Sequence, residues 1–252
     1  MDYQPGTAMQ HYFEAIQTLQ TRVFESQQAQ MKQVASRMAD CVQSGGRIFV
    51  FGTGHSHMLA EEAFYRAGGL AAATPIFSSA LMLHEDAQLS GRLERTPGLA
   101  AGILERYHPA AGEMLFVYSN SGVNHMPVEM AQEAKKCGLF VVSVSALAYA
   151  RVAPPSALGV RLDQVADLAL DNGGLPGDGL LQLEASPWRV GPTSTILGAL
   201  LWNSLMVECL ALLQARGVSS DQLPVFASLN MSGAAEHNQA LLVEWRTLNP
   251  HL

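Results

Sequence analysis

The stretch "FVYSNSGVNHMPVEMAQEA", residues 116–134, decides the fold because its character changes partway along. It is apolar up to Tyr118, becomes small and polar through Ser119-Asn120-Ser121-Gly122, and then continues as an amphipathic pattern. Such an order indicates a buried strand that leads through a turn into a helix. The turn carries two hydroxyls, an amide and a glycine, with no lysine or arginine beside it.

The same plan recurs along the chain. "RIFVFG" (47–52) predicts a short buried strand, followed by a glycine-rich turn and the helical "MLAEEAFYRAGG" (58–69). "LFVVSVSA" (139–146) predicts a third strand and "DLALDNGG" (167–174) a fourth. Apolar strands that alternate with helices predict a parallel sheet covered on both faces. Because ligands bind beyond the carboxyl ends of such strands, the polar turns lie at the edge expected to be functional.

Two long helices are predicted outside this repeating plan. Residues 7–44 have apolar positions at helical spacing, and so long an opening helix is expected to pack at a subunit interface. The run "ILGALLWNSLMVECLALL" (196–213) is interrupted by polar side chains, which favours a helix buried in protein over one in lipid. The less regular segment 75–110 is expected to border the site.

Composition narrows the function classes. Of the 252 residues, 48% are hydrophobic and 15% charged, which is typical of a globular protein. The net charge of −7 disfavours nucleic-acid binding, for which a basic face is expected. The N-terminus lacks the pattern of a signal peptide. The three cysteines are far apart in apolar settings, as in reduced core thiols. We therefore expect a cytoplasmic protein that binds neither nucleic acid nor membrane; the three tryptophans are expected to pack.

Hydroxyl-bearing residues begin three predicted helices. They lie in Gly52-Thr53-Gly54-His55-Ser56-His57, in the turn at 119–122, and in "VGPTSTILGALL" (190–201). Such helix starts suit a phosphate, since backbone N–H and side-chain O–H groups hold its oxygens without a fixed cation. For any one turn, ordinary N-capping is the better explanation, but three such turns, two of them directly after buried strands, favour a shared anion site. No third glycine completes a dinucleotide-binding fingerprint and no lysine completes a P-loop, so nucleotide binding is disfavoured.

These residues resemble a known family. "FGTGHS" after one strand, "YSNSG" after the next and "GPTST" at the start of a late helix resemble the sugar isomerase (SIS) domain family of phosphosugar-binding proteins. The resemblance covers about residues 35–215. The chain length, the long first helix and "GHSHMLAEEAFYRAGG" are most similar to the single-domain phosphosugar-binding branch.

The resemblance implies a three-layer αβα sandwich with a flavodoxin-like five-stranded parallel sheet. It further implies a homodimer or homotetramer with ligand sites near subunit interfaces. We predict an N-terminal helical segment (1–44) for dimerisation and a SIS phosphosugar-binding domain (45–216). A C-terminal extension (217–252) is expected to complete the site or the interface.

The resemblance also assigns the phosphate-binding residues. By motif position, Ser119 and Ser121 hold the phosphate, assisted by Ser56 and a hydroxyl from 193–195. The family often carries Ser or Thr where this sequence has Asn124, whose amide can still donate a hydrogen bond. The full predicted binding set is Gly54, Ser56, Ser119, Asn120, Ser121, Asn124, Ser194 and Thr195.

Aldose–ketose isomerisation requires a base that moves a proton between adjacent carbons through an enediol, and donors around the developing oxyanion. Glu61 and Glu62 are the candidate bases, but neighbours on a helix point about 100° apart and cannot both face one site. Related isomerases carry their base about one turn later, near Arg66 here. The alternative is that one glutamate is solvated and the other pairs with an arginine.

Histidines are the candidates for ring opening. The family often uses a late histidine, sometimes from a neighbouring subunit, and His237 is the preferred counterpart; the alternative is an exposed helix residue beside Glu236. His55 is expected to contact ligand from its loop, whereas His57 could cap or pack. A metal site from His55 and His57 with Glu61 or residues 84–86 is considered but not expected, and no cofactor is predicted.

We therefore expect a phosphosugar-binding protein that acts as an aldose–ketose sugar-phosphate isomerase. Two alternatives stay open: a lyase acting on a phosphorylated amino sugar, and a non-catalytic sugar-phosphate sensor. Asp171-Asn172 after the fourth strand either contacts sugar hydroxyls or, with the two glycines that follow, forms a turn.

Overall fold

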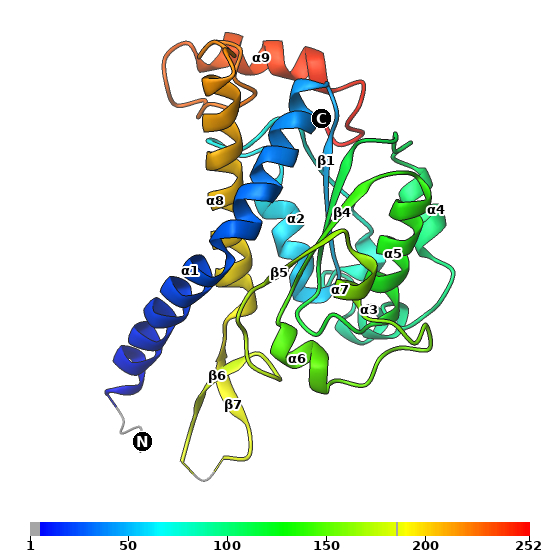
Figure 1. Cartoon of the computed structure of the whole chain (residues 1–252), viewed down its shortest axis with the longest axis vertical. Coiled ribbons are helices and arrows are strands. Elements are labelled where there is room, and N and C mark those ends of the chain that lie inside the picture. Colours follow the sequence, from blue (N-terminus) through cyan, green and yellow to red (C-terminus); the bar gives the residue numbers. More distant parts are fainter. Residues whose placement is uncertain (1–5, 185) are drawn as a thin grey trace.

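A computed structural model describes residues 6–184 and 186–252, so the first five residues of the predicted N-terminal segment lie outside the described residues. The centre is a parallel sheet in the order β2-β1-β3-β4-β5. Its strands are Ala73–Pro75 (β2), Ile48–Gly52 (β1), Met114–Tyr118 (β3), Phe140–Ser145 (β4) and Leu168–Asp171 (β5). The predicted flavodoxin-like five-stranded sheet is confirmed (Figure 1).

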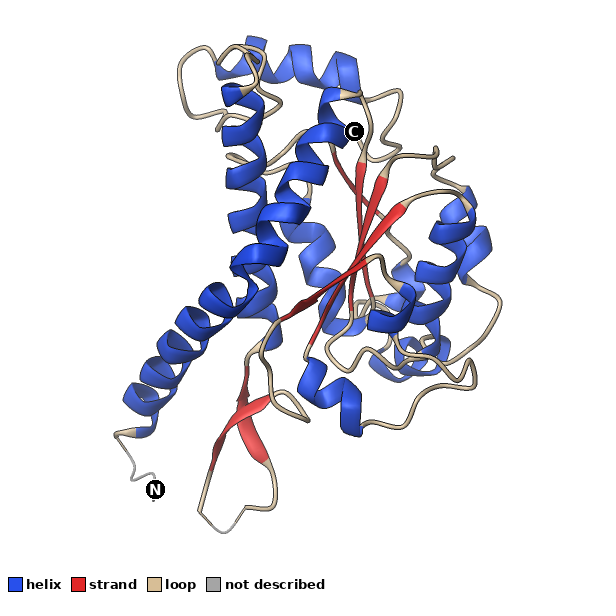
Figure 2. Ribbon diagram, viewed as in Figure 1, coloured by secondary structure: helices blue, strands red, loops and turns tan. Residues whose placement is uncertain are grey.

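Helices cover both faces of this sheet (Figure 2). One face carries α1 (Ala8–Gln43), α2 (Met58–Ala63) and α8 (Ser194–Ala215); the other carries α4 (Ala100–Glu105), α5 (His125–Lys136) and α7 (Leu162–Val165). The remaining helical segments are η1 (Gly54–His57), η2 (Ser79–Leu81), α3 (Ala87–Leu93), α6 (Leu147–Val152) and α9 (Ala234–Trp245).

β1 and β3 are almost entirely apolar because each of them is buried on both faces. Within β1, Ile48 and Val50 join the core beneath α1 and α8, whereas Phe49 and Phe51 join the core beneath α4 and α5. Side chains of a strand alternate between faces, so one apolar run supplies two cores. This is the three-layer sandwich predicted from the sequence.

The register of the sheet brings two of the polar turns together. β1 and β3 pair from Ile48 opposite Met114 to Gly52 opposite Tyr118. Both strands therefore end at the same level, and the turns that follow them leave the same edge of the sheet. β5 and the start of α8 also reach this carboxyl edge, in the lower part of Figure 1.

Two features were not predicted from the sequence. β2 is only three residues long, and an antiparallel hairpin of β6 (Gly179–Gln182) and β7 (Arg189–Pro192) extends beyond the carboxyl edge. The expectation that all three tryptophans pack is wrong for Trp188, which precedes β7 and is 76% exposed. Trp202 and Trp245 are buried as expected.

α8 is one described helix that is long and apolar enough to cross a membrane, judged by length and composition alone. It packs along α1, and Leu197, Leu201, Trp202 and Leu205 are among its buried residues. This is the packing of a core helix, as predicted from the polar residues that interrupt its apolar run.

The C-terminal segment covers the amino edge of the sheet, opposite the turns. Arg47, just before β1, donates from Nη1 to the carbonyl of Leu248 at 2.7 Å. The side-chain amide of Asn249 lies 3.4 Å from the carbonyl of Ala73, at the start of β2. α9 therefore lies near the amino edge, at the top of Figure 1.

Candidate functional site

The turn after β1 has a backbone that requires glycine. A Cβ on Gly52 would lie 2.3 Å from the carbonyl oxygen of Ser56, and Gly54 has a φ of +55°. The hydroxyl of Thr53 donates to the Glu94 carboxylate, and the carbonyl of Glu94 accepts the N–H of Met126 at 2.9 Å. Glu94 thus ties the first turn to the start of α5, which follows the second turn.

The turn after β3 is held largely by its own polar groups. The hydroxyl oxygen of Ser119 accepts the N–H of Gly122 at 3.3 Å, and Gly122 has a φ of +63°. The side-chain oxygen of Asn120 accepts from the amide of Asn172 at 3.0 Å. Ser119 and Asn120 therefore shape the turn, whatever else they contact.

The loop after β5 connects the second turn to the start of α8. Asn172 is buried, and its side-chain oxygen accepts the N–H of Gly174 at 2.9 Å. A Cβ on Gly174 would lie 3.4 Å from the hydroxyl of Thr193. Asp171 accepts the N–H of Gly173 at 2.8 Å, so it forms a turn, one of its two predicted roles.

The start of α8 already holds an anionic group of the chain itself. The Asp178 carboxylate accepts the N–H groups of Thr193 and Ser194 at 3.1 and 2.9 Å. It also accepts their hydroxyls at 3.1 and 2.7 Å. This is how a negative charge is held at a helix N-terminus. Asp178 has a φ of +66°, an unusual conformation for a residue other than glycine.

A cavity of about 450 Å³ opens beside the second turn. Ser121 and Asn124 line it together with Arg95, His125 and Tyr149. The Nε2 atom of His125 is buried and makes no hydrogen bond with the residues that the structure describes. The volume is within the usual range for small-molecule sites.

A second cavity, of about 810 Å³, lies at the opposite, amino edge of the sheet, where Arg37, Arg47 and Lys135 line it. None of the polar turns reaches that edge. We place the candidate site at the carboxyl edge despite the smaller cavity, because ligands of parallel sheets bind there.

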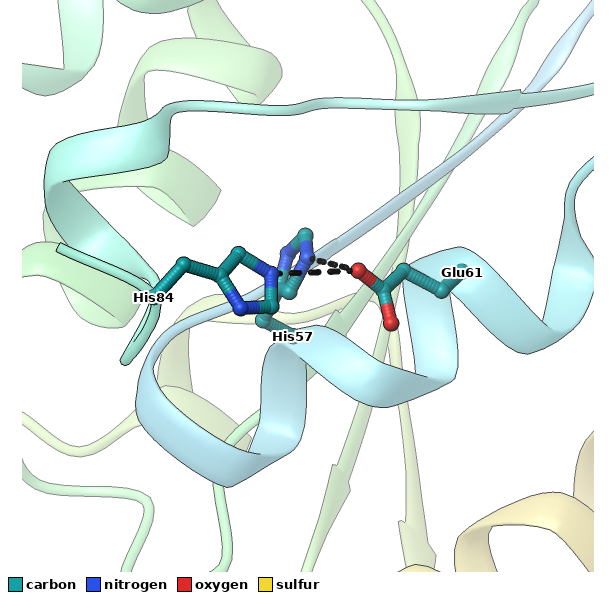
Figure 3. Close-up of side chains that lie close together, drawn as sticks. All are labelled: His57, Glu61 and His84. Atoms are coloured by element: carbon teal, nitrogen blue, oxygen red, sulfur yellow. Dashed lines mark hydrogen bonds and ion pairs between the residues drawn. The ribbon is translucent and has the colours of Figure 1, made fainter.

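Three ionisable side chains meet immediately after the first turn. The Glu61 Oε1 atom lies 2.9 Å from Nε2 of His57 and 3.4 Å from Nε2 of His84. Figure 3 shows both rings directed at this one oxygen while the other carboxylate oxygen points away. His57 and Glu61 are one helical turn apart, and His84 comes from the segment between η2 and α3.

The cluster sets the protonation of its members. Burial lowers the pKa of His57, and the nearby Glu61 carboxylate offsets this only in part. Burial raises the pKa of Glu61, but the hydrogen bonds and charges of His57 and His84 lower it by more, so the pKa lies below its ordinary value. Near neutral pH the carboxylate is ionised and the His57 ring is neutral.

Glu62 has different partners from its neighbour. It pairs with Arg66 and accepts from the side-chain amide of Asn203 at 3.0 Å. This is the predicted pairing of one glutamate with a nearby arginine, on the side of α2 that faces α8.

The structure does not bring every predicted residue together within one chain. His55 and Ser56 lie in η1 beside the cluster, and Thr195 lies in the first turn of α8. His237 lies on α9, near the amino edge, and its Nε2 donates to the carbonyl of Val225 at 2.7 Å. Its proposed role therefore needs a second copy of the chain.

Sequence reasoning missed several polar groups at this edge. Asp178 and Glu94 contact the predicted turns from distant segments, and no local spacing points to them. Arg95, His125 and Tyr149 line the cavity beside Ser121. Of these residues, only His125 could have been suspected from the sequence, because it directly follows Asn124 at the start of the predicted helix.

The sequence matches the SIS domain family over residues 11–146, and the chain belongs to this family. A protein of Brucella anthropi named UPF0309 protein is 40% identical over 222 residues, which cover 88% of this chain and 89% of its own length. A UPF0309 protein of Brucella canis is 39% identical over 224 residues, which cover 89% of this chain and 90% of its own length. The resemblance inferred from the motifs is thus confirmed.

Among solved structures, a phosphoheptose isomerase from Francisella tularensis is similar in fold. It superimposes with a TM-score of 0.54 at 15% sequence identity, covering 82% of this chain and 98% of the isomerase. At this identity the likeness concerns the fold alone.

Proposed function

We propose that this protein binds a phosphorylated sugar at the carboxyl edge of its sheet and interconverts its aldose and ketose forms. One observation carries the catalytic part: two histidines contact the Glu61 carboxylate directly beside the first turn. Their hydrogen bonds and charges hold the pKa of Glu61 below its ordinary value. Membership of the SIS family and a fold shared with a phosphoheptose isomerase support the substrate class.

In this proposal the phosphate is held by groups of the two turns. Gly54 and Ser56 contribute from η1, and Ser121 and Asn124 from the edge of the 450 Å³ cavity. Ser119 and Asn120 keep the second turn in shape through Gly122 and Asn172. Ser194 and Thr195 take part only after the Asp178 carboxylate leaves the start of α8.

Glu61 acts as the base. An ionised carboxylate takes the proton from the carbon next to the carbonyl and returns it to the neighbouring carbon of the enediol. The oxygen that points away from the histidines is free to do so (Figure 3). His57 and His84 keep the carboxylate oriented. The base is assigned to Glu61 rather than Glu62 because Glu62 is paired with Arg66 and Asn203.

Ring opening is assigned to His55, or to His237 of a second copy. A homodimer or homotetramer remains part of the proposal, because within one chain His237 is near the opposite edge of the sheet. Exposed Met9, Phe13 and Phe24 on α1 offer apolar surface for such contacts. Light scattering of the purified protein tests the proposed oligomer, and a measured mass equal to that of a single chain would contradict it.

The catalytic assignment is tested by hydrogen exchange. Candidate aldose and ketose phosphates are incubated with the protein in D₂O and followed by proton NMR. We expect deuterium at C2 of the aldose that binds. Binding without exchange over a broad panel removes the isomerase assignment and leaves the sensor and the lyase.

A further inference from the structure

We propose that His57, Glu61 and His84 bind a divalent transition-metal ion such as Zn²⁺. Their ligand atoms, the two Nε2 atoms and a Glu61 carboxylate oxygen, lie within 4.8 Å of one another. Figure 3 shows the two rings and the carboxylate converging on one region. This inference does not rest on the sugar-binding proposal, because metal binding is measurable without any sugar.

The backbone explains how the cluster forms. His57 ends η1 and Glu61 lies four residues later on α2, so their side chains share one face of a continuous helical stretch. His84 approaches from a separate segment. Its ring centroid lies 5.8 Å from that of His57, and the two rings are nearly perpendicular. The three side chains of the cluster thus come from two separate segments of the chain.

The distances suit a small metal ion after a slight adjustment. Tetrahedral zinc with bonds of about 2.0–2.1 Å holds its ligand atoms about 3.3 Å apart. Glu61 Oε1 lies 3.4 Å from His84 Nε2 and 2.9 Å from His57 Nε2. The 3.4 Å separation already fits, and the 2.9 Å separation has to open by a few tenths of an ångström, for which the Glu61 side chain is exposed enough to move.

The chemistry of the donors selects the class of metal. Two imidazoles and a carboxylate favour zinc and related transition metals over Mg²⁺ or Ca²⁺, which prefer all-oxygen sites. Three protein ligands also leave a fourth position open, as in catalytic rather than structural zinc sites.

One ligand is held rigidly and two can adapt. The His57 ring is buried and packs edge-on against Phe77 with ring centroids 5.2 Å apart. The side chains of Glu61 and His84 are 46% and 62% exposed, which leaves the fourth position open to water or to a substrate oxygen.

The test uses the full chain treated with a chelator and dialysed. Zn²⁺ is titrated against a competing chromophoric chelator, and Co²⁺ is added to a second sample. We expect one ion per chain and, for Co²⁺, the strong visible absorption of a four-coordinate site. Zn²⁺ should also raise the melting temperature, since an ion that binds only the folded chain stabilises it.

Matched variants separate this site from adventitious binding. His84→Ala and Glu61→Gln each remove one ligand and are expected to weaken Zn²⁺ binding by at least roughly tenfold. His55→Ala and Glu85→Gln change an exposed histidine and glutamate nearby and should leave the affinity as it is. Circular dichroism verifies that all four variants fold.

Two results overturn the inference. One is a wild-type affinity no greater than that of His84→Ala; the other is an equal loss in His55→Ala. Either result means that the three side chains form a hydrogen-bonded cluster without a metal. Sugar-phosphate binding would be unaffected by that outcome, so failure here is distinct from failure of the proposed function.

Discussion

The carboxylate of Asp178 accepts both the backbone N–H and the hydroxyl of Ser194, at 2.9 and 2.7 Å. Ser194 is one of the residues that the sequence assigns to phosphate binding. The same donors that suit a phosphate thus hold a carboxylate supplied from just before the β6–β7 hairpin. A phosphate that uses the start of α8 has to displace this internal anion.

Neutralising Asp178 should therefore strengthen anion binding. We expect Asp178→Asn to bind inorganic phosphate roughly two- to fivefold more tightly, which corresponds to the ~0.3–1 kcal/mol that one charge contributes at a helix terminus. Isothermal titration calorimetry measures the change. Glu184→Gln removes one charge from the same hairpin, away from α8, and serves as the control. Unchanged or weaker binding in Asp178→Asn would contradict a role of the start of α8 in holding the ligand.

The two neighbouring glutamates should differ sharply in their importance for catalysis. General bases contribute about 10²–10⁴-fold in rate, so Glu61→Gln is expected to lower kcat by that factor in the exchange assay. Glu62→Gln should retain most of the activity, because Glu62 faces Arg66 and Asn203. Equal losses in both variants would contradict the assignment of the base to Glu61.

A buried ion pair fixes the amino edge of the sheet. Arg47 and Glu113 are bonded at 2.6 and 2.8 Å, and Arg47 also donates to the carbonyls of Tyr107, His108 and Leu248. Glu113→Ala leaves a buried charge unpaired, and the free energy of unfolding is expected to fall by about 3–5 kcal/mol in urea denaturation. Lys136→Ala breaks an exposed pair with Glu133 and should change stability little. A small effect of Glu113→Ala would show that the edge relaxes and lets water reach Arg47.

The three cysteines should differ in reactivity. Burial, with the nearby Glu113 carboxylate, raises the pKa of Cys41 to about 12, and burial raises the pKa of Cys209 to about 12 as well. Cys137 is exposed. A disulfide reagent at neutral pH should modify one thiol of the native chain, and Cys137→Ser should abolish that reaction. Rapid modification of a second thiol would mean that the core opens near α1 or α8.

The sequence was sufficient to predict the centre of the sheet, because β1 and β3 are buried on both faces and are therefore apolar throughout. β2 was not predicted because its three residues are too few to show a hydrophobic pattern. The hairpin escaped because its strands expose polar and apolar residues alike, Trp188 next to β7 among them.

The candidate site was predictable only in part. Glycine and hydroxyl spacing identified the turns, and the backbone requires glycine at Gly52, Gly54 and Gly122. The proposed choice of Glu61 over Glu62 rests on His84, which approaches from another segment, and on Asn203 of α8. Asp178 reaches Ser194 across the hairpin, so local sequence carries no sign of the contact.

Our central proposal is that the carboxyl edge of the sheet binds the phosphate of a sugar phosphate without using a lysine. Thermal shift of the full chain with matched pairs of sugars, phosphorylated and unphosphorylated, tests it most directly. Only the phosphorylated member should raise the melting temperature, and Ser121→Ala should abolish that rise. Equal stabilisation by both members of a pair, or a rise that survives Ser121→Ala unchanged, would contradict it.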